Sequence, residues 1–464
     1  MTGAAGVPPT SVAALAAAYA SGETTPVDVA AAVLARIAGR EHEVHAFADF
    51  DEASVRAAAR ASADRWRRRE ALSRLDGVPV TVKENMHRAG VAARGGTAGS
   101  TPVVPDADSP IVARLLEAGA VIVGSTTMPD WGMLSSGVSS LHGVTRSPLD
   151  PALTVGGSSS GAGAAAAAGF GVVNMGTDIG GSVRFPAAWL GLAALKPSAG
   201  RIPIDVPYLG RAAGPIARTV ADLAAAMAVV SQPDVRDYTS LPPADIAWDD
   251  LAVDPAGLRI ALHLDAGAGM PVDPAIRAAV VAAADRFADA GAEIVELPPF
   301  IDDRALDDVD TFWRVRFWRT FSGLGAARRA LVLPYIAEWV SKGARVSGTR
   351  ALEAYEAIGD LRRRTVLATA PFDAVLSPVA PMLAFPADWP MPWGHDDRGM
   401  AHIGFTLPYN MSGQPASSIN AGFAPDGRAI ALQIAGRRFA DREVLALTSW
   451  WEHARPADAV PAFP

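Results

Sequence analysis

The chain has 464 residues, of which 50% are hydrophobic and 19% charged, so it has enough apolar material for a large core and is not a disordered polymer. Its formal net charge is −8 and its basic residues form no patch, which argues against nucleic acid as a partner. Because cysteine is absent, a cysteine nucleophile, a disulfide framework and a thiolate metal site are all excluded.

Residues 1–22 lack the basic start and the long apolar segment of a signal peptide. No stretch approaches the ~20 uninterrupted apolar residues of a membrane-spanning helix. We therefore expect a cytoplasmic protein without a membrane partner.

The first 75 residues predict a helical lead-in. One helix is expected from Ser11 to Gly22, a second from Thr25 through Ile37 with Pro26 at its first position, and a third over residues 52–74. A turn then leads into VPVTV, whose β-branched residues predict a strand that Lys83 closes.

Helices and strands then alternate along the chain. Residues 109–132 read as helix, strand and loop, and residues 257–297 read as strand, helix and strand. This alternation predicts an α/β fold in which helices cover both faces of a mostly parallel, twisted, mixed sheet. One large domain is the simplest interpretation, with a core over 76–230, a variable helical region over about 300–370 and a closing segment over 371–464.

Other segments leave alternatives open. Residues 214–230 predict a capped helix, and residues 371–381 a buried strand that ends in prolines. A Pro- and Trp-rich loop over 386–397 either covers the active site or wraps the surface. Four aromatic residues at helical spacing are interpreted as core, with a pocket roof as the alternative: Trp313, Phe317, Trp318 and Phe321.

Two glycine- and serine-rich clusters flank an alanine-rich helix over 162–168. The N–H groups that precede this helix favour negative charge. A phosphate loop is disfavoured because no Lys follows Gly161. The G-x-S-x-G pattern around Ser159 would need a preceding strand to form a hydrolase elbow, whereas residues 146–153 predict a proline-broken turn.

TVGGSSSGAG at 154–163 and GTDIGGSVRFPA at 176–187 together resemble the signature of the amidase signature family. DGVPVTVKEN, GPIARTVADL and FTLPYNMSGQPA resemble further family segments, so the resemblance runs from about Thr25 to the C-terminus and is thinnest between Asp234 and Pro371. It implies the amidase signature fold and a serine amidohydrolase with a Ser, cis-Ser, Lys triad.

The resemblance assigns a role to each triad residue. Ser182 is the nucleophile that forms an acyl-enzyme. Ser158 is the serine after a cis peptide bond, and its hydroxyl relays the proton from Ser182 to Lys83. Because only a neutral amine accepts a proton, burial must lower the pKa of Lys83 below the ~10.4 of a free lysine.

The resemblance also assigns the surroundings of the triad. The N–H groups of Ile179, Gly180 and Gly181, followed by that of Ser182, match the family's oxyanion hole. Three further residues are expected to support this loop: Ser159, Asp178 and Arg184.

Trp131 and Met133 lie where family members place pocket residues, so we expect an apolar acyl or aryl pocket. The implied function is an amidase for aryl or apolar amides, with esters and carbamates as further substrates, that needs no cofactor and acts as a monomer or homodimer. The alternative is an A-type subunit of a glutamine-dependent transamidation complex. Phe185 weighs against it, because such subunits commonly carry a polar residue there.

Histidine chemistry is disfavoured. His42 and His45 are one residue short of the H-E-x-x-H spacing of a zinc site. A loop with metal-capable side chains has no further anchored ligand, so no metal is expected, and neither His142 nor His402 lies in a context typical of a Ser-His-Asp triad. The residues of that loop are His395, Asp396, Asp397 and His402.

Overall fold

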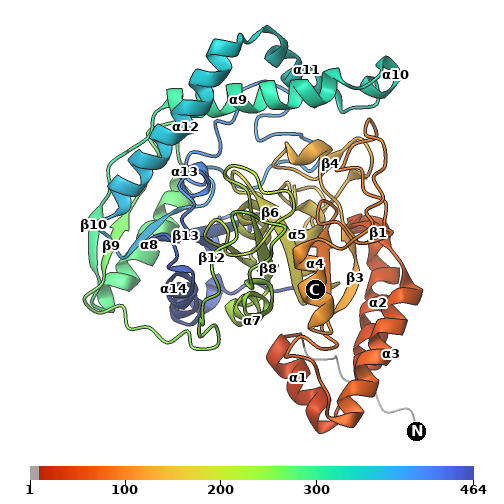
Figure 1. Cartoon of the computed structure of the whole chain (residues 1–464). Helices are drawn as coiled ribbons and strands as arrows, with labels where there is room; N and C mark the ends of the chain where they lie inside the picture. Colours follow the sequence, from red (N-terminus) through yellow and green to blue (C-terminus); the bar gives the residue numbers. More distant parts are fainter. Residues whose placement is uncertain (1–9) are drawn as a thin grey trace.

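The structure is a computed structural model and describes residues 10–464. Its centre is a mixed sheet of 11 strands (Figure 1). A separate two-stranded sheet pairs β4 (Val138–Ser139) with β5 (Gly143–Val144). In sheet order the large sheet contains β1 (Phe47–Phe50), β3 (Val121–Thr126), β2 (Pro79–Lys83), β6 (Val173–Asp178), β8 (Ala212–Ala217), β7 (Ala193–Lys196), β12 (Ala416–Phe423), β13 (Ala429–Gly436), β11 (Ala374–Pro378), β9 (Arg259–Leu262) and β10 (Glu293–Glu296).

The sheet is mixed, as expected, but parallel pairing occurs in two separate groups. Strands β3, β2 and β6 are parallel, and so are β11, β9 and β10. The strands between these groups pair antiparallel, which differs from the mostly parallel arrangement expected. One reason is local: a short turn joins β12 to β13, and a connection that short permits only an antiparallel pair. The predicted helix over 214–230 also proved to be strand β8 followed by a shorter helix.

Helices cover both faces of the sheet, as expected. In β7, Ala193 and Leu195 belong to the core cluster that also contains side chains of α1, α4, α7, α8 and α14, whereas Ala194 belongs to the cluster with side chains of α2, α3, α5 and α6. This alternation follows from the period of two along a strand. The helices are α1 (Val12–Ser21), α2 (Pro26–Val44), α3 (Glu52–Arg68), α4 (Pro110–Glu117), α5 (Ser160–Ala168), α6 (Arg184–Leu190), α7 (Val220–Val230), α8 (Pro274–Asp289), α9 (Asp303–Ser322), α10 (Ala326–Arg329), α11 (Pro334–Ser341), α12 (Gly348–Thr369), α13 (Leu407–Met411) and α14 (Asp441–Ala454).

The lead-in contains α1, α2 and α3 as expected, but strand β1 lies between α2 and α3, which the helical prediction missed. Its residues 1–9 lie outside the described residues. Ser11 caps α1, and Thr25 forms a capping box with Asp28 at the start of α2. Helix α2 is longer than predicted because its last residue, Val44, is buried. Helix α3 is shorter than predicted, because Arg69 adopts a left-handed conformation that ends it.

Helices α9 to α12 gather at the top of Figure 1, away from α1 to α3. The apolar faces of α9, α11 and α12 form a second core with α6, α13 and the loops around residues 379–403. The helical region thus forms a layer beside the central sheet.

Helix α5 brings the first glycine- and serine-rich cluster against the sheet. Every residue of this helix is buried. A Cβ at Gly161 would lie 2.2 Å from the Ala46 carbonyl oxygen, and one at Gly163 would lie 2.7 Å from Pro186. Small residues are therefore required here for close packing.

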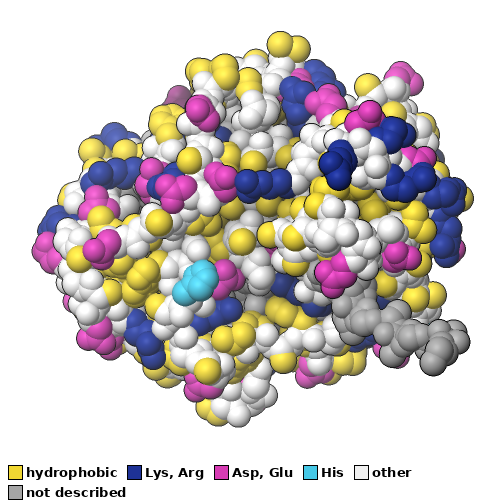
Figure 2. Space-filling view, turned by 90° about the horizontal axis from the view of Figure 1, so that it is seen from below, with side chains coloured by type: hydrophobic (Ala, Val, Ile, Leu, Met, Phe, Trp, Pro, Cys, Tyr) yellow, Lys and Arg dark blue, Asp and Glu magenta, His cyan; other side chains and the backbone are white. Residues whose placement is uncertain are grey.

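On the face shown in Figure 2, basic and acidic side chains are interspersed among apolar and uncharged ones. Within residues 10–464, the helices include none whose length and apolarity would let it cross a bilayer.

Candidate active site

Strand β2 carries Lys83 into the interior of the protein. Its side chain is fully buried, and Nζ lies 2.8 Å from Ser158 Oγ and 3.1 Å from Ser159 Oγ. Both serines precede or cap α5, and the Gly157–Ser158 peptide bond is cis. The sheet and α5 thus bring Lys83 together with Ser158 and Ser159, which lie 75 and 76 residues later in the sequence.

The hydrogen bonds of Ser159 orient the Lys83 amine. The Ser159 hydroxyl donates to the Thr177 carbonyl oxygen at 3.1 Å and accepts from the Thr177 N–H at 3.2 Å. Because its one proton is used, Ser159 can only accept from Lys83. A neutral amine that donates to Ser159 still has its lone pair, which can accept the Ser158 proton.

The environment disfavours the charged form of Lys83. Burial lowers its pKa well below the ordinary value, and the positive charge of Arg211 lowers it further. Asp178 and Glu84 act in the opposite direction and do not compensate. A buried lysine with a lowered pKa is suited to accept a proton.

Ser182 follows the sharp turn between β6 and α6. It lines the same cavity as Ser158, and its carbonyl oxygen accepts the Ser159 N–H at 3.1 Å. Gly181 makes the turn with a φ of 121°, a conformation that strongly favours glycine. A Cβ there would also lie 2.5 Å from the Phe185 ring.

The N–H groups of this turn are not equivalent. The Gly181 N–H donates to Asp178 Oδ1 at 2.8 Å, so it is already engaged, which conflicts with its expected role as an oxyanion donor. The N–H groups of Ile179, Gly180 and Ser182 have no hydrogen-bond partner among the described residues. Ile179, Gly180 and Ser182 also line the cavity, so these three groups remain available to a ligand.

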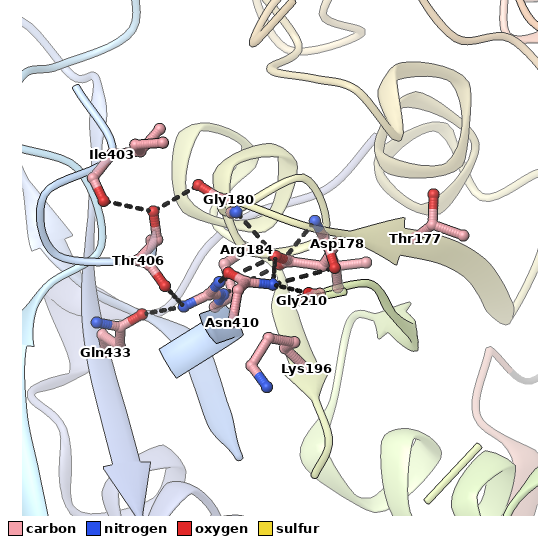
Figure 3. A network of polar contacts seen from close by, with 12 residues as sticks. Thr177, Asp178, Gly180, Arg184, Lys196, Gly210, Ile403, Thr406, Asn410 and Gln433 are labelled. Carbon is pink, nitrogen blue, oxygen red and sulfur yellow. Dashed lines mark hydrogen bonds and ion pairs between the residues drawn. The ribbon is translucent and has the colours of Figure 1, made fainter. Parts of the chain in front are cut away.

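Asp178 and Arg184 form a fully buried, bidentate ion pair beneath the turn (Figure 3). The Asp178 carboxylate also accepts the N–H of Gly181 and Val183. Burial alone would raise the pKa of Asp178, but Arg184 and Asn410 hold it far below its ordinary value. The pair therefore fixes the turn from below.

Residues that the sequence analysis missed complete this network. The Thr406 hydroxyl donates to the Gly180 carbonyl oxygen at 2.5 Å, and Gln433 Oε1 accepts from Arg184 at 2.7 Å. Asn410 bridges Asp178 to the Gly210 carbonyl oxygen (Figure 3). They come from α13, its preceding turn and β13. FTLPYNMSGQPA was already matched to the family segment there, which was the one available signal.

Lys196, at the end of β7, lies beside this network (Figure 3). It is buried, and its Nζ donates to the Pro197 carbonyl oxygen at 2.9 Å. Burial and then repulsion from Arg184 lower its pKa to about 7. Lys196 does not line the cavity, and the described network residues form no hydrogen bond with its side chain.

The serines open into a cavity of about 520 Å³. Trp131 and Met133 line it, where the sequence analysis expected pocket residues. Of the four aromatic residues at helical spacing, all on α9, Trp313 and Phe317 line the cavity, whereas Trp318 and Phe321 do not. Apolar lining predominates, and the cavity also has a polar side that includes Asn85, His87, Thr177, Arg211 and Arg316.

Among the described residues, none of the Pro- and Trp-rich loop over 386–397 lines the cavity, whereas Met400, His402 and Ile403 of the chain after it do. Asp397 pairs with Arg314 and Lys342, which ties the loop to α9 and the segment after α11. His402 lies buried at the cavity wall, where its Nε2 is 2.6 Å from Ser135 Oγ. Burial lowers the pKa of His402 to about 3, so the ring is neutral.

The described residues do not form the other sites that the sequence analysis considered and disfavoured. Ser159 is fully buried and bonded on every side, unlike an exposed hydrolase nucleophile. Between residues 10 and 464, no three potential metal ligands come together. His142 Nε2 lies 3.0 Å from Glu84 Oε2, and His142 does not line the cavity. Phe185 is buried against Trp189, with ring centroids 5.3 Å apart.

Comparisons with known proteins identify the family of this chain. The chain is 31% identical to an acylamidase of Rhodococcus erythropolis, over 97% of this chain and 96% of the relative. It is also 33% identical to the A-type glutamyl-tRNA(Gln) amidotransferase subunit of Chloroflexus aggregans, over 96% and 98%. A bacterial aryl acylamidase of the amidase signature family superposes with a TM-score of 0.87, at 26% identity and 96% coverage of each chain. A family model described as amidase matches residues 28–445, and the chain therefore belongs to the amidase signature family.

Proposed function

We propose that the protein is an amidase that hydrolyses the C–N bond of aryl or apolar acyl amides through an acyl-enzyme on Ser182. Esters and carbamates, including urethanes, are further substrates of the same chemistry. The proposal rests on Lys83, which is buried and has a lowered pKa. Its Nζ lies 2.8 Å from the hydroxyl oxygen of Ser158, and Ser158 and Ser182 line the same cavity.

In the first half of the reaction the Ser182 hydroxyl gives its proton to Ser158, which gives its own proton to Lys83. The freed Ser182 Oγ bonds to the substrate carbonyl carbon, and the carbonyl oxygen becomes an oxyanion. The N–H groups of Ile179, Gly180 and Ser182 stabilise this charge, since nothing else in the described chain uses them.

Collapse of the tetrahedral species breaks the C–N bond. The proton on Lys83 returns through Ser158 to the leaving nitrogen, which departs as an amine. A water molecule then repeats the sequence on the acyl-enzyme, and the products are a carboxylic acid and free Ser182.

The apolar cavity supports the substrate class. Trp131 stacks on Phe317 with ring centroids 6.1 Å apart, and Trp313 and Met133 line the same space. Transfer of an aryl or alkyl group from water to this wall is favourable. The acylamidase and aryl acylamidase relatives support the same class.

The alternative is an A-type subunit of a transamidation complex, which the amidotransferase relative supports. Such a subunit uses glutamine, whose small polar side chain leaves the aromatic wall unfilled. The test is kcat/KM of the purified single chain for an anilide and for glutamine. A higher value for the anilide is expected, and a higher value for glutamine would favour the alternative.

A further inference from the structure

Two arginine side chains line the cavity without a carboxylate partner. Arg211 lies just before β8, and Arg316 lies on α9, so the two come from different parts of the fold. Both are half-buried. Neither forms an ion pair with any carboxylate of residues 10–464. Within the described residues, the one side-chain hydrogen bond of Arg211 goes to the Val206 carbonyl oxygen at 3.4 Å.

The structural arginines nearby behave differently. Arg184 pairs with Asp178, and Arg314, two residues before Arg316 on α9, pairs with both Asp310 and Asp397. Charges removed from water are normally paired in this way. The two guanidinium groups at the cavity lack a carboxylate partner, which indicates that a ligand supplies the negative charge.

Stacking holds one guanidinium in place. Arg316 lies over the Tyr208 ring at 3.5 Å from its centroid and near the Phe317 ring at 4.9 Å. Stacking of this kind fixes the plane of the group and leaves its N–H donors directed outward. The planar fork of an arginine matches a carboxylate better than a single-point acceptor.

The charges around this end of the cavity are mostly positive. Arg319 adds a third guanidinium at the rim, and Asp205 is the one carboxylate that lines the cavity among the described residues. Asp205 is exposed and pairs with neither arginine. Burial and then repulsion from Arg316 lower the pKa of Arg211 to about 10, against a weaker opposite effect of Asp205.

One face of α9 presents apolar and cationic groups together. Trp313, Arg316, Phe317 and Thr320 follow the three- and four-residue spacing of one helix face, and all four line the cavity. A ligand that fits this face has an apolar or aryl body and a negative end.

We propose that the substrate is an aryl or apolar amide that carries a carboxylate, which Arg211 and Arg316 bind away from the scissile bond. This inference rests on the proposed amidase function and names its substrate class more narrowly. The carboxylate is on either the acyl group or the leaving amine, and the experiment distinguishes these two positions.

The experiment uses two matched pairs of anilides. In the acyl pair, glutaric acid monoanilide is compared with the corresponding primary carboxamide, and release of aniline is measured. In the amine pair, butyryl-4-aminobenzoate is compared with butyryl-4-aminobenzamide, and release of the free aromatic amine is measured. We expect the carboxylate to raise kcat/KM by about tenfold or more in one pair, as one charge-assisted hydrogen bond would.

Variants connect this preference to the two arginines. Arg211→Gln and Arg316→Gln should each reduce the ratio of carboxylate to carboxamide, and Arg316→Lys should retain part of it. Arg304→Gln is the matched control on α9, because Arg304 is exposed and does not line the cavity, and it should keep the wild-type ratio. A ratio near one in both wild-type pairs, or a ratio unchanged in both Gln variants, would overturn the proposal.

Two measurements separate this inference from the proposed function. Turnover of the neutral carboxamides tests the amidase function alone, so an enzyme that hydrolyses them without a carboxylate preference keeps the function and loses the inference. Calorimetric binding of all four compounds to Ser182→Ala tests the carboxylate site without turnover. Equal affinity of the acids and the carboxamides there would contradict the inference, and tighter binding of an acid would support it.

Discussion

The Asn410 side-chain amide donates to both the main-chain oxygen and the Oδ1 of Asp178, at 3.0 and 2.9 Å. Asp178 itself holds the N–H groups of Gly181 and Val183, on either side of Ser182. A residue of α13, more than 200 positions away in sequence, therefore helps to hold the turn on which Ser182 lies.

We expect Asn410→Ala to lower kcat on an anilide, because the turn that presents Ile179 and Gly180 to the oxyanion loses its anchor. Misplacement of such donors reduces the rate on the order of 10²-fold, while KM changes little, since the cavity wall is intact. Steady-state kinetics with a thermal melt of the folded variant would measure this. An increased KM at wild-type kcat would instead assign Asn410 to substrate binding.

The sequence predicted the parts of the site that lie in short local patterns. The two glycine- and serine-rich clusters were found because their composition is unusual for a core, and Lys83 was assigned through the resemblance of DGVPVTVKEN to a family segment. Asn410 lies in the matched segment FTLPYNMSGQPA, but the match gave it no role, and Gln433 was not found because a buried amide in a strand has no local pattern that distinguishes it from a structural residue. Their roles come from contacts across the fold.

The fold shows the same division. The caps of α1 and α2 and the strand that carries Lys83 were predicted from local signals. Strand β8 was taken as part of a helix because GPIA precedes a strong N-cap at Thr219 without a separate turn. Its antiparallel pairing with β6 and β7 depends on non-local contacts, which a single segment does not encode.

A fluorophosphonate should label Ser182 and not Ser159. Ser182 lines the cavity beside free N–H donors, whereas the Ser159 hydroxyl is fully buried and donates to Thr177. Mass mapping of the labelled peptide decides between them, and Ser182→Ala provides the control that should lose the label. Modification of Ser159 in the wild-type protein would show that the nucleophile was assigned incorrectly.

Arg184→Gln should destabilise the fold by about 3–5 kcal/mol, because it leaves the buried Asp178 carboxylate without its counter-charge. Arg304→Gln should cost about 0–1 kcal/mol, since its pairing with Asp308 is at the surface. Urea unfolding at neutral pH would compare the two variants.

The pH dependence of that stability has a definite sign. The pKa of Asp178 in the folded protein is below its ordinary value. The ionised carboxylate therefore stabilises the fold fully at a pH above its pKa in the unfolded chain. This stabilisation is lost as the pH falls toward the pKa of the folded protein. The loss on acidification should therefore be smaller in Arg184→Gln than in the wild type. If both proteins lost the same stability on acidification, the Asp178–Arg184 ion pair would not be the source of that loss.

The last prediction concerns the base. Because burial and the Arg211 charge lower the pKa of Lys83, kcat/KM on a neutral anilide should rise with pH through an ionisation below that of a free lysine. Lys83→Ala should lose about 10²- to 10⁴-fold in rate together with this ascending limb. Ser158→Ala should keep part of the limb, since water can replace the relay, and His402→Ala and His142→Ala should keep its shape. Arg211→Gln removes a repelling positive charge, so the limb should move to higher pH. If the limb persists in Lys83→Ala and disappears in a histidine variant, a histidine is the base and the lysine mechanism is wrong.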